Sequence, residues 1–256
     1  MIIFTEYAGH ATSLSKDAVH KGYYAVVAAG GDGTINEVAS SLVNSHTALG
    51  IIPLGSGNGF AYHTGIRRDI VKAIRLLNDG YKICIDTATL NDEFFINVAG
   101  LGLDAKVAFI TKKNKKRGFL PYFIATLQES INFKYMHLTI STPEKQWSGY
   151  YAMIAVANGS MYGYDLSIAQ GAKINDGLFE VVLMRKAPVF RYFGTALLMF
   201  IKSLHKSGVV DIIRCNEMIV STKDAGYYHL DGEGYKTEKD TFNFRIHPSS
   251  LFLITK

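Results

Sequence analysis

The chain has 256 residues, of which 48% are hydrophobic and 12% aromatic, so it is too apolar for a disordered protein and long enough for one large domain or two smaller ones. Its 27 basic and 22 acidic residues give a net charge of +5, which favours anionic partners, but it carries no nucleic-acid-binding motif and we expect no nucleic-acid partner. It shows no signal sequence, no segment long enough to span a membrane and no metal-ligand spacing around its two cysteines, which predicts a cytoplasmic protein.

The first third of the chain alternates between predicted strands and helices. Residues 25–29 have the composition of a strand that is buried on both faces, and residues 35–43 carry an apolar stripe at helical spacing. This alternation predicts a doubly wound, Rossmann-like α/β fold with a parallel sheet. The predicted strands are residues 2–5, 25–29 and 48–53, and the predicted helices are residues 11–20, 35–43 and 69–78, the last with Asp69 as its N-cap.

Near residue 82 the pattern changes to short strands with only two helices among them. Asn91-Asp92 and Thr142-Pro143-Glu144 each separate two apolar runs, and both are hairpin signals. We therefore predict a β-rich second part of the chain. Its strands are expected at residues 83–90, 94–99, 135–141, 148–157, 178–184, 217–221, 226–230 and 242–247, and its helices at residues 120–131 and 188–206.

Two glycine-rich turns directly follow the predicted strands 25–29 and 48–53. Bare backbone N–H groups at a strand–turn–helix junction suit a phosphate group, and the carboxyl ends of neighbouring parallel strands face one crevice. A lone Gly-Gly would read better as an ordinary tight turn, but the Asp, Thr, Asn and Glu that accompany the first turn, and the second turn after it, predict nucleotide binding. Their spacing fits neither the dinucleotide fingerprint nor a P-loop. The candidate binding residues are Gly30, Gly31, Gly33, Thr34, Asn36, Glu37, Gly55, Ser56, Gly57 and Asn58.

The two glycine-rich turns, together with Asp231-Gly232-Glu233 near the C-terminus, resemble motifs of the diacylglycerol kinase family of lipid kinases. This family shares its catalytic domain with sphingosine and ceramide kinases. The Gly-Gly-Asp-Gly turn is also similar to that of NAD kinases. The resemblance covers essentially the whole chain, but many members carry Thr in place of Ser56 and Asp in place of Gly59. It implies a nucleotide-binding domain of residues 1–82 and about 243–256, and a β-rich sandwich domain of residues 83–242 for the lipid substrate.

The resemblance also predicts a strand–helix unit ahead of the first residues. Family members open with a strand that ends in Asn-Pro beside a basic residue, and this chain shows neither. We therefore expect an incomplete start, with further residues upstream or a strand supplied by another chain, and poor activity of residues 1–256 alone.

The family resemblance implies ATP and Mg²⁺ as cofactors, and phosphoryl transfer needs a base for the incoming hydroxyl group. Asp231 and Asp32 are the candidates for the base or for a contact to Mg²⁺, with Asp231 preferred. Glu233 would share a strand face with Asp231 and assist it. The alternative is a turn acid and a solvated acid without a catalytic role.

Five further candidates come from the resemblance. Asn175, Asp176 and the carbonyl group of Leu178 resemble a loop that binds a structural Mg²⁺, although a simple Asn-Asp-Gly turn explains them equally well. Thr5 and His10 are expected on the nucleotide side, while His10 would otherwise cap a helix.

The implied lipid substrate requires contact with a membrane surface. A cluster of Lys112, Lys113, Lys115, Lys116 and Arg117 precedes the segment 119–123, which contains three aromatic residues. This suits peripheral contact with the cytoplasmic membrane, although a solvated charged loop is the commoner case. We expect the amphipathic helix 188–206 to lie in the core rather than at the membrane. The sequence does not decide whether the protein forms a homodimer.

We therefore expect an ATP-dependent lipid kinase that acts on diacylglycerol or on a sphingoid or ceramide-like lipid. The alternatives are an NAD kinase and a non-catalytic fragment that binds a nucleotide or a lipid.

Overall fold

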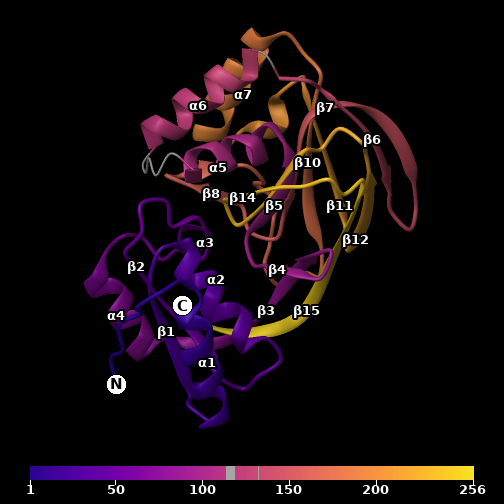
Figure 1. Cartoon of the computed structure of the whole chain (residues 1–256). Helices are drawn as coiled ribbons and strands as arrows, with labels where there is room; N and C mark the ends of the chain where they lie inside the picture. Colours follow the sequence, from indigo (N-terminus) through magenta and orange to yellow (C-terminus); the bar gives the residue numbers. More distant parts are fainter. Residues whose placement is uncertain (114–118, 132) are drawn as a thin grey trace.

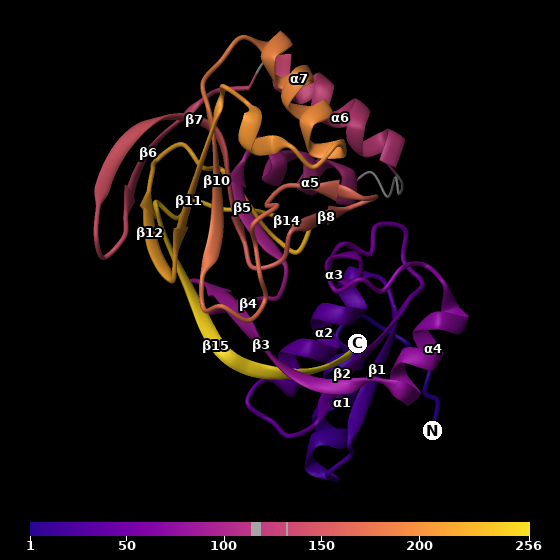
Figure 2. The same ribbon diagram turned by 180° about the vertical axis from the view of Figure 1, so that it is seen from behind.

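The protein has two lobes (Figure 1) in a computed structural model that describes residues 1–113, 119–131 and 133–256. The smaller lobe holds the N-terminal α/β segment, and the larger one is rich in strands with three helices on one side (Figures 1 and 2). Long strands run from one lobe into the other. The predicted division into an α/β part and a β-rich part is therefore visible in the fold.

The N-terminal lobe has the predicted alternation of strands and helices. Strands β1 and β2 pair in parallel, in the register Ala25 to Ala48. The Asp69 carboxylate accepts a hydrogen bond from Lys72 N at 3.0 Å and caps α4, as predicted. The elements are α1 (His10–His20), β1 (Ala25–Gly30), α2 (Asp32–Leu42), β2 (Ala48–Pro53), α3 (Gly59–His63) and α4 (Ile70–Asp79).

Burial follows the apolar pattern of the sequence in this lobe. Ile35, Val38 and Leu42 form one stripe of α2 and are almost fully buried against β1 and β2. Helix α2 begins at Asp32, three residues earlier than predicted, because its first turn grows directly out of the glycine turn. This places the aspartate at the start of the helix.

The β-rich lobe forms most of a 13-stranded sheet whose inner face is packed with Phe95, Phe179, Phe242 and Phe244. Its first elements are β3 (Tyr81–Leu90), β4 (Glu93–Phe95), β5 (Val98–Gly102), α5 (Leu103–Lys113), α6 (Phe119–Ile131), β6 (Met136–Ser141), β7 (Gln146–Ala157), β8 (Met161–Gly163) and β9 (Leu166–Ser167). The others are β10 (Phe179–Arg185), α7 (Val189–Phe200), a 3-10 helix (Leu204–Lys206), β11 (Val210–Cys215), β12 (Glu217–Ser221), β13 (Tyr227–Leu230), β14 (Glu233–Lys236) and β15 (Thr241–Thr255).

Strands β3 and β15 join the lobes. They pair antiparallel along nearly their whole length, and Leu253 of β15 lies next to Leu49 of β2 (Figure 2). The C-terminal strand thus pairs with a strand of the first lobe. The hairpin between β3 and β4 turns at Asn91 and Asp92, whose φ angles of 48° and 67° fit the predicted tight turn.

One predicted strand is absent from the described structure, and several elements of the structure were not predicted. Residues 2–5 form no strand: Ile2 and Phe4 are 87% and 84% exposed, and among the described residues β1 pairs only with β2. An extended segment without a partner cannot satisfy its backbone groups by pairing, so it is not a strand. Helices α3 and α5 and strands β8, β9, β11 and β14 were not predicted, because short or Gly-rich segments carry little periodic signal.

The prediction that helix 188–206 lies in the core is wrong. The helix ends at Phe200, and one of its faces is exposed: Phe190, Leu197 and Ile201 are 70%, 63% and 60% accessible. An amphipathic pattern fixes which residues share a face but not what covers that face. Of the residues that the structure describes, no helix is long and apolar enough to cross a bilayer.

Candidate active site

The two glycine turns lie against each other. The carbonyl oxygen of Gly30 accepts hydrogen bonds from Leu54 N at 2.9 Å and Gly55 N at 3.2 Å, which ties the first turn to the second. A Cβ atom on Gly31 would lie 3.2 Å from Gly55 Cα, and one on Gly55 would overlap Gly31 Cα. The turns therefore need glycine at their contact.

The N-terminus of α2 opens at this contact. Gly31 is the N-cap and no side chain caps it, so the first N–H groups of the helix have no intrahelical partner. A Cβ atom on Gly33 in the first turn would meet no atom within 4 Å, so this side of the turn is open. Open N–H groups at a helix N-terminus suit an anion.

Asp32 is half-buried between the first glycine turn and the start of α3. Its Oδ1 accepts a hydrogen bond from Phe60 N at 3.3 Å, and its Oδ2 would lie 3.4 Å from a Cβ atom on Gly57. Burial raises the pKa of the Asp32 carboxyl, the N–H groups of residues 58–60 oppose this, and the nearby charge of Asp231 raises it further. Asp32 thus faces the second glycine turn.

Asp231 is held by four hydrogen bonds from both lobes. Its carboxylate accepts from Ile96 N at 3.0 Å, Asn97 N at 2.8 Å and Val98 N at 3.1 Å, and from Asn36 Nδ2 of α2 at 2.7 Å. Burial raises the pKa of the Asp231 carboxyl, and these donors work against that rise. Since Asn36 lies one helical turn after Asp32, the two aspartates sit on the same side of α2.

The expectation that Asp231 and Glu233 share a strand face is wrong. Asp231 and Gly232 form the turn between β13 and β14, with φ angles of 48° and 85°. Glu233 is exposed and its Oε2 lies 2.6 Å from Lys112 Nζ. A two-residue turn sends the two carboxylates apart, so Glu233 does not join the site.

Of the other predicted nucleotide residues, some shape the glycine turns and others are exposed or lie away from them. Thr34 packs on Gly30, where a Cβ atom would lie 2.5 Å from Thr34 Oγ1, and the Glu37 Oε1 accepts from Gly9 N at 2.9 Å. Asn58 has a left-handed φ of 53° and donates to Gly55 O at 2.8 Å, which shapes the second turn. Ser56 and Thr5 are exposed, and His10 Nδ1 accepts from Glu6 N at 3.2 Å outside the crevice.

The predicted structural Mg²⁺ loop does not fit a cation. Asp176 forms an ion pair with Arg214, and its Oδ1 accepts from Leu178 N at 3.1 Å. The loop is further held by Gly177 N, which donates to Asp86 Oδ2 at 2.7 Å. Within the described part of the chain, no three His, Cys, Asp or Glu side chains cluster as metal ligands. The arginine supplies the positive charge that the carboxylate needs, and Asn175 is exposed.

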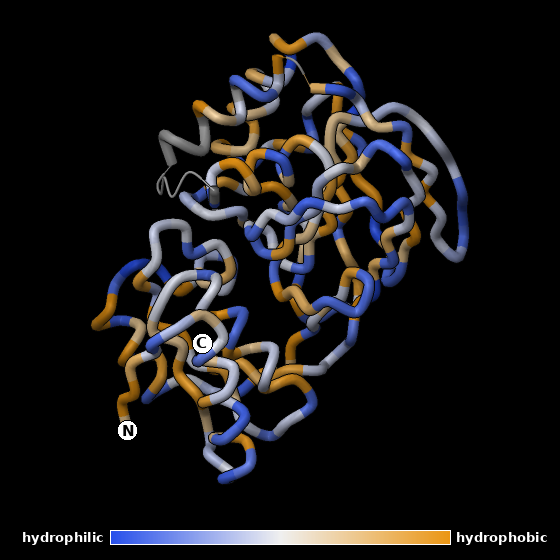
Figure 3. The backbone as a smooth tube through the Cα atoms, viewed as in Figure 1, coloured by the Kyte–Doolittle hydropathy of each residue, from blue (hydrophilic) through white to orange (hydrophobic). Residues whose placement is uncertain are grey.

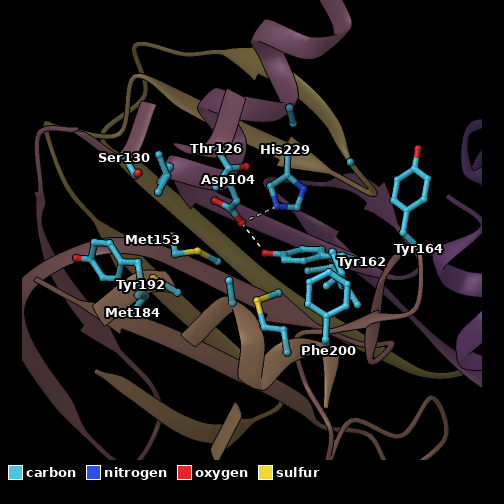
Figure 4. Close-up of a pocket in the computed structure, with 18 of the residues that line it drawn as sticks. Asp104, Thr126, Ser130, Met153, Tyr162, Tyr164, Met184, Tyr192, Phe200 and His229 are labelled. Carbon is cyan, nitrogen blue, oxygen red and sulfur yellow. Dashed lines mark hydrogen bonds and ion pairs between the residues drawn. The ribbon is translucent and has the colours of Figure 1, made fainter. Parts of the chain in front are cut away.

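An apolar cavity of about 200 Å³ lies beside Asp231 in the β-rich lobe (Figure 4). Helices α5, α6 and α7 cover strands β5, β7 and β10 here, and the hairpin of β8 and β9 closes one side. Asn97, Asp231 and Gly232 belong to the lining next to the N-terminal lobe, because a Cβ atom on Gly59 would lie 3.0 Å from Asn97 Nδ2 and Asp231 accepts a hydrogen bond from Asn36. The apolar lining includes Val98, Leu103, Met153, Leu166, Met184, Val189, Tyr192, Phe193, Met199 and Phe200.

A polar cluster in the wall of this cavity was not predicted. Asp104 Oδ2 accepts hydrogen bonds from Tyr162 Oη at 2.7 Å and is 3.0 Å from His229 Nε2 (Figure 4). His229 Nδ1 is buried and has no hydrogen-bond partner among the described residues. These side chains come from α5, β8 and β13, so no local pattern could have grouped them.

His63, at the end of α3, predicts a pH-dependent stability. Its Nδ1 accepts from Ser160 N at 3.0 Å, and burial lowers its pKa from 6.5 to about 4. Between pH 6.5 and about 4, His63 is therefore protonated in the unfolded chain and neutral in the folded protein. We expect the contribution of neutral His63 to the free energy of unfolding to be complete above pH 6.5 and to fall by about 3 kcal/mol as the pH drops towards 4.

Urea unfolding between pH 4 and pH 7 measures this change. His63→Asn places an amide oxygen near the Nδ1 position without a titrating group, so its stability should vary less over this range. An equal pH slope in the two proteins would assign the dependence to other groups.

Comparison with known proteins agrees with this architecture. Residues 1–90 match the diacylglycerol kinase catalytic domain, and residues 97–255 match the YegS C-terminal NAD kinase beta sandwich-like domain. The chain is 29% identical to the diacylglycerol kinase of Bacillus subtilis, over 90% of this chain and 77% of the relative. It is 30% identical to a protein of Chromohalobacter salexigens named as a YegS-like lipid kinase, over 96% of this chain and 80% of the relative.

Solved structures share the fold. Two Bacillus anthracis structures named for a diacylglycerol kinase superpose with TM-scores of 0.82 and 0.76 at 21% and 18% identity. The superpositions cover 98% and 100% of this chain, respectively, and 84% of each Bacillus anthracis chain. An NAD kinase from Archaeoglobus fulgidus, solved with ATP, reaches 0.51 at 14% identity, over 92% of this chain and 79% of its own.

Proposed function

Because the chain belongs to the family of lipid kinases that shares the diacylglycerol kinase catalytic domain, we propose that it transfers the γ-phosphate of ATP to a hydroxyl group of a lipid. The family makes it a phosphotransferase with an alcohol acceptor. The observation that carries the proposal is the position of Asp231, which lies at one end of an apolar cavity and is bonded to α2 of the nucleotide lobe.

The glycine turns form the nucleotide side of the proposed site. The open N–H groups at the start of α2 would bind phosphate oxygens, and the glycine contact lets the backbone approach them closely. Asp32 faces the second turn with one carboxylate oxygen. Mg²⁺ is commonly held by one or two carboxylates together with nucleotide phosphates, so Asp32 is the side chain that would hold it here, where it would neutralise phosphate charge.

The lipid side is the apolar cavity. Its lining would bind the hydrocarbon part of the lipid, and the hydroxyl group would lie at the end formed by Asn97, Asp231 and Gly232. In the transfer, the lipid oxygen forms a bond to the γ-phosphorus, the bond from that phosphorus to the bridging oxygen of ADP breaks, and Asp231 takes the hydroxyl proton. Burial, which raises the pKa of Asp231, makes it a stronger proton acceptor than an ordinary aspartate.

The buried cluster of Asp104, His229 and Tyr162 gives the cavity one polar wall. A polar group of the lipid other than the reacting hydroxyl would be recognised there, which favours a substrate with a second polar group, such as diacylglycerol or a sphingoid or ceramide-like lipid. NAD kinase is the second candidate, supported by the shared fold. The carbon-lined cavity favours a lipid over a dinucleotide.

Radiolabel transfer from [γ-³²P]ATP tests the proposal. The purified chain is offered diacylglycerol, sphingosine, ceramide and NAD in parallel, with and without Mg²⁺. Because residues 1–256 alone are expected to be poorly active, we expect weak label in a lipid and none in NAD. Label in NAD alone would establish the second candidate, and no label in any acceptor would leave a binding protein without turnover.

A further inference from the structure

Helix α7 lies at the end of the β-rich lobe that is remote from the N-terminal lobe (Figures 1 and 3). It presents an apolar stripe to solvent. Phe190, Phe193 and Leu197 are 70%, 50% and 63% exposed, and the stripe continues through Phe200 and Ile201. These positions recur at helical spacing, so they lie along one face of the helix. Large apolar residues gathered on one exposed face mark an interaction surface rather than scattered surface residues.

The segment that carries this stripe holds only basic charges. Residues 186–206 contain Lys186, Arg191, Lys202 and Lys206 and no aspartate or glutamate. All four basic residues are exposed. Lys202 also approaches Asp165 Oδ1 at 3.5 Å, so part of its charge is shared with the β8–β9 turn. An apolar helix face that is rimmed by cations matches an anionic bilayer surface in chemistry and in charge.

The stripe is continuous with the cavity beneath it. Phe193 and Phe200 belong both to the exposed stripe and to the cavity lining, while Val189, Tyr192 and Met199 of the same helix face the cavity alone. One helix therefore separates the apolar cavity from the outside and is apolar towards both. A lipid could pass between the two along side chains that stay apolar throughout.

We propose that the exposed face of α7 is the surface by which the protein docks on an anionic bilayer, and that it delivers the lipid into the cavity beneath. The inference rests on the proposed lipid kinase function, since it assigns the cavity to the lipid. A second copy of this chain is the competing occupant of the stripe. Four cations on each copy would face each other across a symmetric contact, which opposes that arrangement.

Vesicle sedimentation tests this docking surface. The full chain is mixed with vesicles of phosphatidylcholine alone or of phosphatidylcholine with phosphatidylglycerol. We expect binding to the anionic vesicles that weakens as salt is added. In Phe190→Ser/Leu197→Ser, binding should weaken by about tenfold or more, because two exposed side chains that would enter the bilayer are lost and neither lines the cavity.

The matched control is Ile74→Ser/Ile219→Ser. It removes two isoleucines that are 52% and 47% exposed on α4 and β12, away from α7, and it should bind vesicles as the unchanged protein does. Arg191→Gln/Lys206→Gln should weaken binding to anionic vesicles and flatten the salt dependence.

Two further measurements separate the possible failures. Phosphorylation of a short-chain, water-soluble lipid should stay unchanged in the α7 variant, while phosphorylation of the same headgroup in anionic vesicles should fall. Equal vesicle binding by the α7 variant and the unchanged protein would overturn the docking surface, as would a dimer in light scattering that the α7 variant abolishes. Loss of transfer to every lipid with intact vesicle binding would instead refute the kinase proposal and leave the docking surface standing.

Discussion

Gly31→Val is expected to abolish ATP binding. A Cβ atom on Gly31 would already lie 3.2 Å from Gly55 Cα, and the valine methyl groups extend further into the second turn. The two turns would separate, and the N–H groups that open between them would lose their common geometry. Isothermal titration calorimetry with ATP measures the loss, which we expect to exceed about a hundredfold in affinity, or about 3 kcal/mol.

A second variant separates the loss of ligand contact from the loss of packing. Gly33→Ala adds a methyl group that meets no protein atom within 4 Å, so the fold should be unaffected while a phosphate bound at the helix start would be obstructed. Gly208→Ala, in the loop before β11, has equal free space and should change nothing. Unchanged ATP affinity in both Gly31→Val and Gly33→Ala would remove the nucleotide from these turns.

The sequence was most informative where one stretch of chain carries its own constraint. The runs at 25–29 and 48–53 and the stripe of Ile35, Val38 and Leu42 are local patterns, and the parallel pair and buried helix that they predict are present. The glycine turns were expected to meet because parallel strands present their carboxyl ends at one edge. The packing of Gly31 on Gly55 agrees with that expectation.

Contacts between distant segments were beyond the sequence patterns. The alternation rule put Asp231 and Glu233 on one face, but the rule holds only within a strand, and the chain turns at Asp231. The cluster of Asp104, Tyr162 and His229 spans 125 residues of sequence between its outer members, so nothing local indicates it. The surroundings of α7 were equally hidden, since an apolar stripe packs in a core or faces a bilayer with the same spacing.

Part of the predicted basic cluster lies outside the described residues, as do the side chains of residues 119–123. Lys112 is described, and its ammonium group pairs with Glu233 at 2.6 Å. The membrane contact inferred for α7 therefore depends on a different set of residues from those that the sequence suggested.

Asp231→Asn is expected to lower kcat by about 10²–10⁴, because the amide cannot accept the lipid hydroxyl proton. ATP affinity should change little, since the glycine turns are on the other lobe. The substitution also places an amide among three backbone N–H donors, so the free energy of unfolding should fall by about 1.5–3 kcal/mol. Turnover is therefore compared well below the melting temperature of the variant.

Two companion variants decide which carboxylate acts as the base. Glu233→Gln changes an exposed acid paired with Lys112 and should keep normal turnover, which would confirm that only one member of the Asp-Gly-Glu block reaches the site. Asp32→Asn should weaken the Mg²⁺ dependence of ATP binding as well as turnover, because Asp32 faces the second glycine turn. If Asp231→Asn retains more than about a tenth of normal turnover while Asp32→Asn is inactive, the proton acceptor is Asp32 and the four hydrogen bonds of Asp231 serve to hold the lobes together.

The pH dependence of kcat gives an independent test of the same assignment. Burial raises the pKa of Asp231, so a base at this position becomes protonated at a higher pH than an exposed aspartate would. The rate should therefore begin to fall, as the pH is lowered, at a higher pH than the ordinary aspartate value of 3.8 would give. Asn36→Ala removes one of the donors that stabilise the ionised carboxylate and should move this fall to still higher pH. If Asp231 only holds the lobes together, it takes no proton from the lipid. Its titration would then leave kcat unchanged at every pH at which the protein stays folded. Asn36→Ala would in that case shift the pH dependence of unfolding and leave that of kcat unchanged.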